Sequence, residues 1–155
     1  MDNFENILKE LSPYFGTTLH PDTKSSCTVI WQDKVTFQLE LDRSQENLVA
    51  GMTIGEVAPG VYRESIFKEA LKINSQQSLS HNAVFAFTTK LNQLVLFLMT
   101  PIKEIVADKL MVQLQQMIEL GNHWQDALSR GQIPVRTQPE NAPTNQSSGL
   151  FGMKP

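Results

Sequence analysis

The sequence has few of the residues that metal, redox or hydrolytic chemistry requires. Only one of its 155 residues is a cysteine, Cys27, and its three histidines have no second ligand type at metal-binding spacing: His20, His81 and His123. The segment GMTIG, residues 51–55, lacks the lysine of a phosphate-binding loop. We therefore expect no catalytic residues, no metal and no cofactor, and so a protein that is not an enzyme.

Long apolar runs are also missing. No run approaches the roughly 20 residues that a membrane-spanning helix needs. The N-terminal segment MDNFENILKEL lacks the basic stretch and apolar run of a secretion signal. One cysteine excludes an internal disulfide, which suits a reducing compartment. We expect no membrane insertion and a protein that stays in the cytosol in which it is made.

Basic residues are too few for a nucleic-acid partner. The formal net charge is −3, and up to Leu128 the chain has 10 Lys and Arg against 15 Asp and Glu. Residues 129–155 have 3 basic residues against 1 acidic residue. Because proteins bind a phosphate backbone mainly through basic side chains, this balance predicts no nucleic-acid binding.

What the sequence does contain is a regular alternation of helical and strand patterns. Apolar residues recur at steps of three and four, or alternate with polar ones, in eight successive segments. The helical segments are residues 3–15, residues 61–72 and a long helix that starts at Thr100 and Pro101. The strand segments are residues 27–31, 35–42, 48–55, 82–89 and 94–99. The order helix, three strands, helix, two strands, helix predicts an α+β fold with a five-stranded, mainly antiparallel sheet packed with three helices.

The chain divides by composition near Leu128. Residues 1–128 hold all eight predicted elements and form one α+β domain. Residues 129–155 are rich in Pro, Asn, Gln and Ser and show no periodicity, which predicts a disordered tail.

Two predicted elements have more apolar surface than one subunit needs. LVLFLM, residues 94–99, would expose apolar side chains on both faces of a strand. The helix over residues 61–72 is apolar over about half of its circumference, whereas a surface helix needs a stripe of only about 100°. A second copy of the chain would cover both surfaces, which predicts a homodimer. The alternative is a monomer whose last helix bends across the second strand pair.

Three segments together resemble a known family. MDNFENILKELSPYFG, CTVIWQDKVTFQLELD and LVLFLMTPIKEIVADKLMVQLQQMIELGNHWQDAL are similar in pattern and order to the class I type III secretion chaperones, the Tir-chaperone (CesT-like) family. The resemblance covers about residues 1–128 and rests on overall pattern, because the family has no short diagnostic motif. It implies a non-enzymatic homodimer in the bacterial cytoplasm. Its implied clients are secreted effectors, whose N-terminal chaperone-binding segment it holds extended, soluble and competent for export. The secretion-apparatus ATPase is a further implied partner.

The resemblance also suggests roles for particular residues. One set would line the effector groove: Ile7, Leu8, Leu11, Val29 and Trp31. A second set would form the dimer interface: Ile66, Phe67, Leu71, Phe85 and Phe87. Each of these residues could instead belong to the ordinary core. A different class of function is also open, a non-secretory dimeric adaptor or scaffold that binds a folded protein partner.

Overall fold

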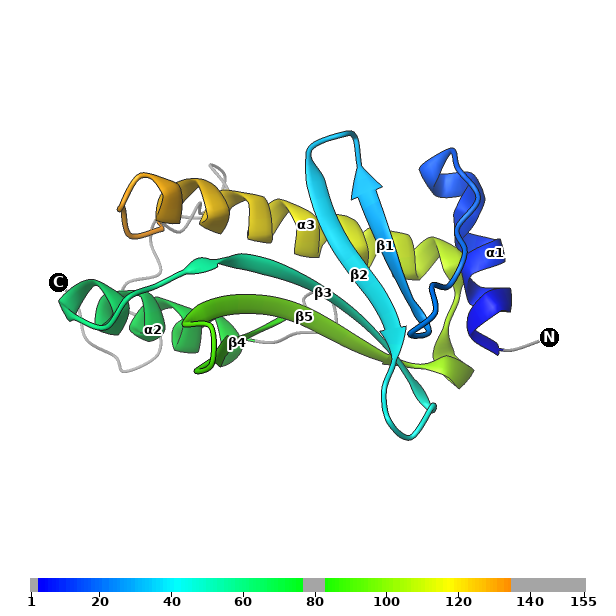
Figure 1. Ribbon diagram of the computed structural model, residues 1–155, viewed down its shortest axis with the longest axis horizontal. Coiled ribbons are helices and arrows are strands. Elements are labelled where there is room, and N and C mark those ends of the chain that lie inside the picture. Colours follow the sequence, from blue (N-terminus) through cyan, green and yellow to red (C-terminus); the bar gives the residue numbers. More distant parts are fainter. Residues whose placement is uncertain (1–2, 77–82, 135–155) are drawn as a thin grey trace, which may run out of the picture.

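The computed structural model describes residues 3–76 and 83–134; of the predicted disordered tail, residues 129–155, the part from residue 135 onward lies outside that description. The described chain forms three α-helices, five strands and one short 3₁₀ helix (Figure 1). In chain order these are α1 (Asn3–Phe15), β1 (Ser26–Trp31), β2 (Val35–Leu41), β3 (Asn47–Glu56), α2 (Val61–Asn74), β4 (Val84–Thr88), β5 (Gln93–Pro101), η1 (Ile102–Glu104) and α3 (Ala107–Ser129). The predicted order of elements is confirmed.

The five strands form one antiparallel sheet in the order β1-β2-β3-β5-β4. β3 and β5 share the longest ladder, which extends from the pair Asn47–Pro101 to the pair Glu56–Gln93. The predicted α+β class with a five-stranded antiparallel sheet is therefore confirmed. β1 and β4 are the two edge strands.

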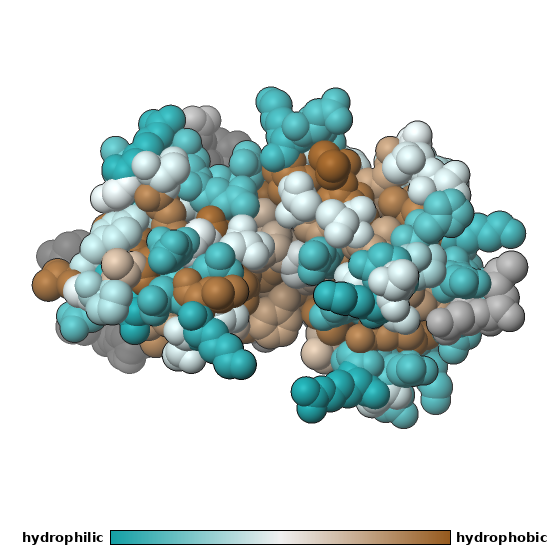
Figure 2. All heavy atoms as spheres, in the orientation of Figure 1, coloured by the Kyte–Doolittle hydropathy of each residue, from teal (hydrophilic) through white to brown (hydrophobic). Residues whose placement is uncertain are grey.

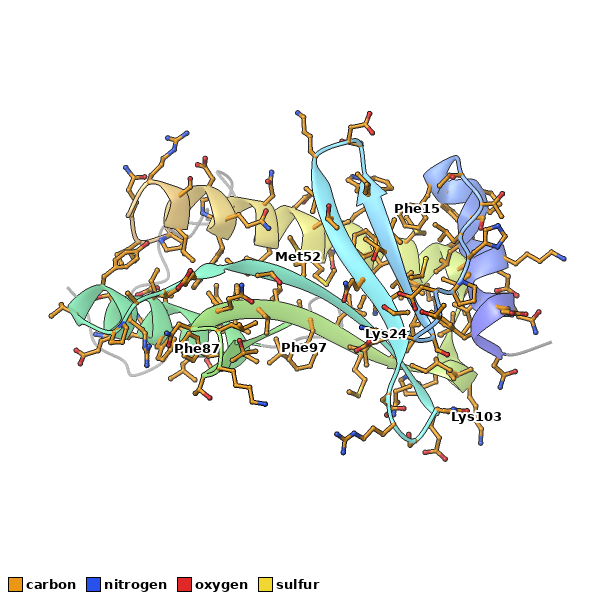
Figure 3. All side chains as sticks on the ribbon, in the orientation of Figure 1. Phe15, Lys24, Met52, Phe87, Phe97 and Lys103 are labelled. Atoms are coloured by element: carbon orange, nitrogen blue, oxygen red, sulfur yellow. The ribbon has the colours of Figure 1, made fainter. Side chains whose placement is uncertain are left out.

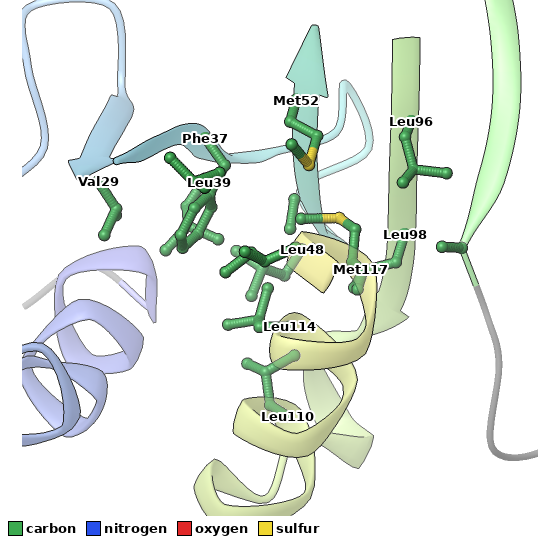
Figure 4. Packing of buried hydrophobic residues seen from close by; sticks show 14 of the residues in the cluster. Val29, Phe37, Leu39, Leu48, Met52, Leu96, Leu98, Leu110, Leu114 and Met117 are labelled. Carbon is green, nitrogen blue, oxygen red and sulfur yellow. The ribbon is translucent and has the colours of Figure 1, made fainter. Parts of the chain in front are cut away.

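All three helices pack on the same face of this sheet. Leu94, Leu96 and Leu98 of β5 point into that face and are buried against α3, as Figure 4 illustrates for part of the cluster. α2 packs on β4 and is tied to the segment just after α3, where the Tyr62 hydroxyl donates a hydrogen bond to the backbone oxygen of Gln132 at 2.8 Å. The opposite face of β5 carries Val95, Phe97 and Met99, as the alternation predicts, and no helix among residues 3–76 and 83–134 covers it.

The predicted start of the last helix at Thr100 and Pro101 is wrong. Both residues belong to β5, where they pair with Leu48 and Asn47 of β3, and α3 begins only at Ala107. Thr followed by Pro is a frequent helix start, but here the long β3 strand offers ladder partners up to Pro101. The extension of the sheet therefore decides where the helix can begin.

Candidate functional site

An apolar groove lies between α2 and the β4–β5 hairpin. Its lining is almost entirely apolar and encloses a volume of about 190 Å³. Phe67 and Phe87 meet edge to face on one side, with ring centroids 4.8 Å apart. Leu71 of α2 is 67% exposed beside them. Leaving the Leu71 side chain in water beside an apolar groove costs free energy that a partner would recover by covering both. This surface therefore suits binding to another protein.

Two polar side chains fix the shape of this groove. The Arg63 guanidinium lies 4.6 Å from the ring centre of Phe87 and donates a hydrogen bond to Asn92 Oδ1 at 3.3 Å. Asn74 makes two hydrogen bonds to the backbone of Phe85, with its Nδ2 donating at 2.9 Å and its Oδ1 accepting at 2.8 Å. The Asn74 amide therefore takes the place of a neighbouring strand at the edge of β4. Sequence reasoning missed Arg63 and Asn74, since their partners come from other elements.

The structure brings together four of the five residues that were proposed for the dimer interface. Phe67, Leu71, Phe85 and Phe87 all line the groove. Ile66 lies on the adjacent side of α2, is fully buried and packs into the subunit core. The wide apolar surface of α2 therefore has two parts: one packs into the subunit core, and the other lines the groove.

A second, aromatic surface lies between the end of α1 and β1. The ring of Phe15 contacts Trp31 edge to face at 5.3 Å and Phe37 at 5.9 Å between centroids. Phe37 is buried, whereas Phe15 and Trp31 are partly exposed. Tyr14, also partly exposed, donates a hydrogen bond to the Asp108 carboxylate, which raises the pKa of the tyrosine. This contact ties the end of α1 to the first turn of α3.

The residues proposed for an effector groove are adjacent to this surface but mostly beneath it. Ile7, Leu8 and Leu11 of α1 are buried in the core, and Val29 of β1 is also buried. Only Trp31 among the five keeps exposed area. Any partner on this side therefore meets Trp31 directly, while the other four support the surface from below.

Three findings on the described residues concern metal binding, the single thiol and membrane spans. Within residues 3–76 and 83–134, no group of three or more His, Cys, Asp or Glu could hold a metal ion. Cys27 is buried, and burial raises the pKa of its thiol, which disfavours the reactive thiolate. No helix in this part of the chain is both long and apolar enough to cross a membrane.

The sequence and the fold identify the family. The model of the Tir chaperone protein (CesT) family matches residues 6–125, most of the chain. The protein therefore belongs to the Tir chaperone protein (CesT) family, and the resemblance drawn from its sequence is confirmed. No curated protein gives a significant sequence match.

Solved structures of low sequence identity share the fold. A chain of the HopA1–SchA chaperone–effector complex matches with a TM-score of 0.66 at 15% identity, covering 81% of this chain and 94% of that one. A chain of the heterodimeric ExoU–SpcU complex from the type III secretion system of Pseudomonas aeruginosa matches with a TM-score of 0.62 at 17% identity, covering 77% and 95%. YbjN from E. coli, described as a candidate transcription regulator, matches with a TM-score of 0.54 at 15% identity, covering 81% and 91%.

Proposed function

We propose that this protein is a class I type III secretion chaperone of the bacterial cytoplasm. It binds the N-terminal chaperone-binding segment of a secreted effector in extended form and keeps the effector soluble and competent for export. The family match over residues 6–125 carries this proposal. The two apolar surfaces support it, because holding an extended client requires exposed contact area rather than catalytic groups. On the same grounds the protein is not an enzyme.

The functional unit in this proposal is a homodimer formed through the α2–β4 groove. Leu71 of each copy would enter the groove of the other, where Phe67 and Phe87 supply the contact area. A two-fold axis lets this one patch bury itself. The effector would lie across the aromatic surface of Phe15 and Trp31, one such surface on each subunit.

Binding to N-terminal effector fragments tests the proposal. The purified chain is mixed with unfolded N-terminal fragments of proteins encoded beside it, and complex mass is measured by light scattering after gel filtration. We expect complexes of two chains with one fragment. Trp31→Ser should weaken fragment binding, and Val112→Ser, which replaces an exposed side chain on the far side of α3, serves as the matched control. If the chain ignores every extended fragment, the proposal is wrong.

A second candidate function is a non-secretory dimeric adaptor that binds a folded partner. The similarity in fold to YbjN favours keeping it, because that protein is described in terms of transcription rather than secretion. The same experiment separates the two functions, since an adaptor would bind a folded domain and leave extended fragments free.

Two further parts of the proposal have different grounds, the first in the family and the second in the composition of the chain. The secretion-apparatus ATPase is proposed as a docking partner of the loaded chaperone. The division into a domain of residues 1–128 and a dispensable tail is also a proposal, although α3 ends one residue later, at Ser129. Deleting residues 135–155 should leave the melting temperature unchanged within error, and a large drop would contradict this division.

A further inference from the structure

The sheet opens into a fork between β2 and β3. Their ladder extends only from the pair Gln38–Gly51 to the pair Leu41–Leu48. Among the described strands, β3 beyond Gly51 continues to Glu56 with β5 alone as a neighbour, and β2 residues 35–37 pair with β1 alone. A cleft of about 570 Å³ fills this fork. Figure 3 places Met52 in the opening, in front of α3, and Figure 2 shows a hollow with apolar side chains in the middle of this face.

The two strands that face the fork lack a strand partner there. β3 residues 52–56 and β2 residues 35–37 each have one side without a ladder. The carbonyl of Thr53 takes a substitute partner from α3, because Gln125 Nε2 donates a hydrogen bond to it at 2.8 Å. The edge of β4 is different, since Asn74 satisfies both the N–H and the carbonyl of Phe85.

The lining of the cleft combines polar wall residues with apolar residues. The wall residues come from the turn before β2, the exposed side of β2 and α3: Lys34, Thr36, Gln38, Glu40 and Gln125. The apolar lining residues belong to both faces of the sheet, with Phe37, Met52 and Leu96 on the helix side and Val95 and Phe97 on the opposite side. A strand turns successive side chains to opposite faces, so a segment with alternating apolar and polar residues matches both surfaces.

We propose that this fork is a second client site, into which an extended segment of the effector inserts as an additional strand between β2 and β3. This inference rests on the proposed chaperone function and adds a binding site to it. An extended peptide is the occupant that the chemistry favours, because only a polypeptide backbone offers donors and acceptors at the spacing of two facing strand edges.

Charge gives the occupant a preferred orientation. Lys34 stands at the open end of the β2 wall and Glu40 near the closed end, where it pairs with Val49 in the ladder. The inserted segment should therefore place an acidic residue near Lys34 and a basic residue near Glu40. Between these ends, its apolar side chains would lie beside Phe37 of β2 and Met52 of β3, the two neighbouring strands.

Hydrogen exchange on the full-length protein tests the site. The probe is an N-terminal effector fragment that forms a complex in the binding experiment above. We expect the amide of Thr53, whose carbonyl faces the fork, and the fork-facing amides among residues 35–37 to exchange at least tenfold more slowly in the complex than in the chain alone. Thr36→Trp should fill the cleft from an exposed position and weaken the fragment at least tenfold, whereas Val112→Trp on α3 should leave its affinity unchanged.

The outcomes separate this proposal from the proposed function. A fragment that binds without protecting the Thr53 amide, and that binds Thr36→Trp as well as the unmodified chain, overturns the fork site and leaves the chaperone function standing. Failure of every fragment to bind overturns both. Strong protection of the Thr53 amide in the chain alone would also overturn the proposal. Loss of that protection on deleting residues 135–155 would mean that these residues occupy the cleft. Loss of that protection on dilution would mean that a second copy of the chain occupies it. The exchange measurement uses the unmodified chain, so the test stands even if Thr36→Trp does not fold.

Discussion

Replacing Leu71 with serine is the sharpest test of the proposed dimer. Leu71 is 67% exposed in the single subunit, on the rim of the groove formed by Phe67 and Phe87. Since its side chain lies mostly in water, the substitution should change the stability of an isolated subunit by no more than about 0.5 kcal/mol. A large effect can therefore arise only where a second chain covers this position.

The size of the effect follows from the area that a partner would cover. Burying a leucine completely contributes about 1.5 to 3 kcal/mol, so covering the exposed two-thirds contributes about 1 to 2 kcal/mol for each copy. A two-fold interface contains the residue twice, which gives about 2 to 4 kcal/mol for the dimer. The dimer dissociation constant of Leu71→Ser should then rise by roughly 30-fold to 1,000-fold.

Sedimentation velocity over a dilution series measures this constant. Val112→Ser is the matched control, because Val112 is 54% exposed on α3 and lies outside the groove. We expect the control to dimerise like the unmodified chain. Leu71→Glu, which would bury a charge without a partner, should give monomers or aggregates. An unchanged dissociation constant for Leu71→Ser, or an unmodified chain that is already monomeric, would refute the proposed interface.

Three further predictions concern stability. Gly121→Val should lower the free energy of unfolding by about 1 to 3 kcal/mol in urea titrations, because any Cβ at this position of α3 collides with the Met52 thioether. Asn74→Ala should cost about 1 to 3 kcal/mol by the same measurement, since it removes both hydrogen bonds to the β4 backbone. Hydrogen bonds, led by that from the Asn47 side chain, lower the pKa of Asp42 below the ordinary value of 3.8. Asp42 therefore stabilises the fold above that pH and loses this contribution as the pH falls through the lower folded-state pKa. The difference in melting temperature between the unmodified chain and Asp42→Ala should accordingly be larger at pH 7 than at pH 2.

The sequence by itself determined the order and the kind of the elements. The helix over Asn3–Phe15 has the bounds that its periodicity predicts, and the alternation in residues 35–42 corresponds to the alternating burial of β2. These features depend on contacts between near neighbours in the chain and on a single pattern of apolar residues, which is why local reasoning finds them. The surplus of apolar surface on α2 was also visible in the sequence.

Only the tertiary structure decided which apolar residues remain outside. Leu8 and Leu71 are both leucines on apolar helix faces, yet Leu8 is fully buried beneath the sheet and Leu71 is mostly exposed. The start of α3 and the fork between β2 and β3 depended likewise on how far β3 extends beside its neighbours. Periodicity tells which face of an element is apolar but not what lies opposite it. That depends on packing between segments far apart in the chain, and it sets the surfaces left for a partner.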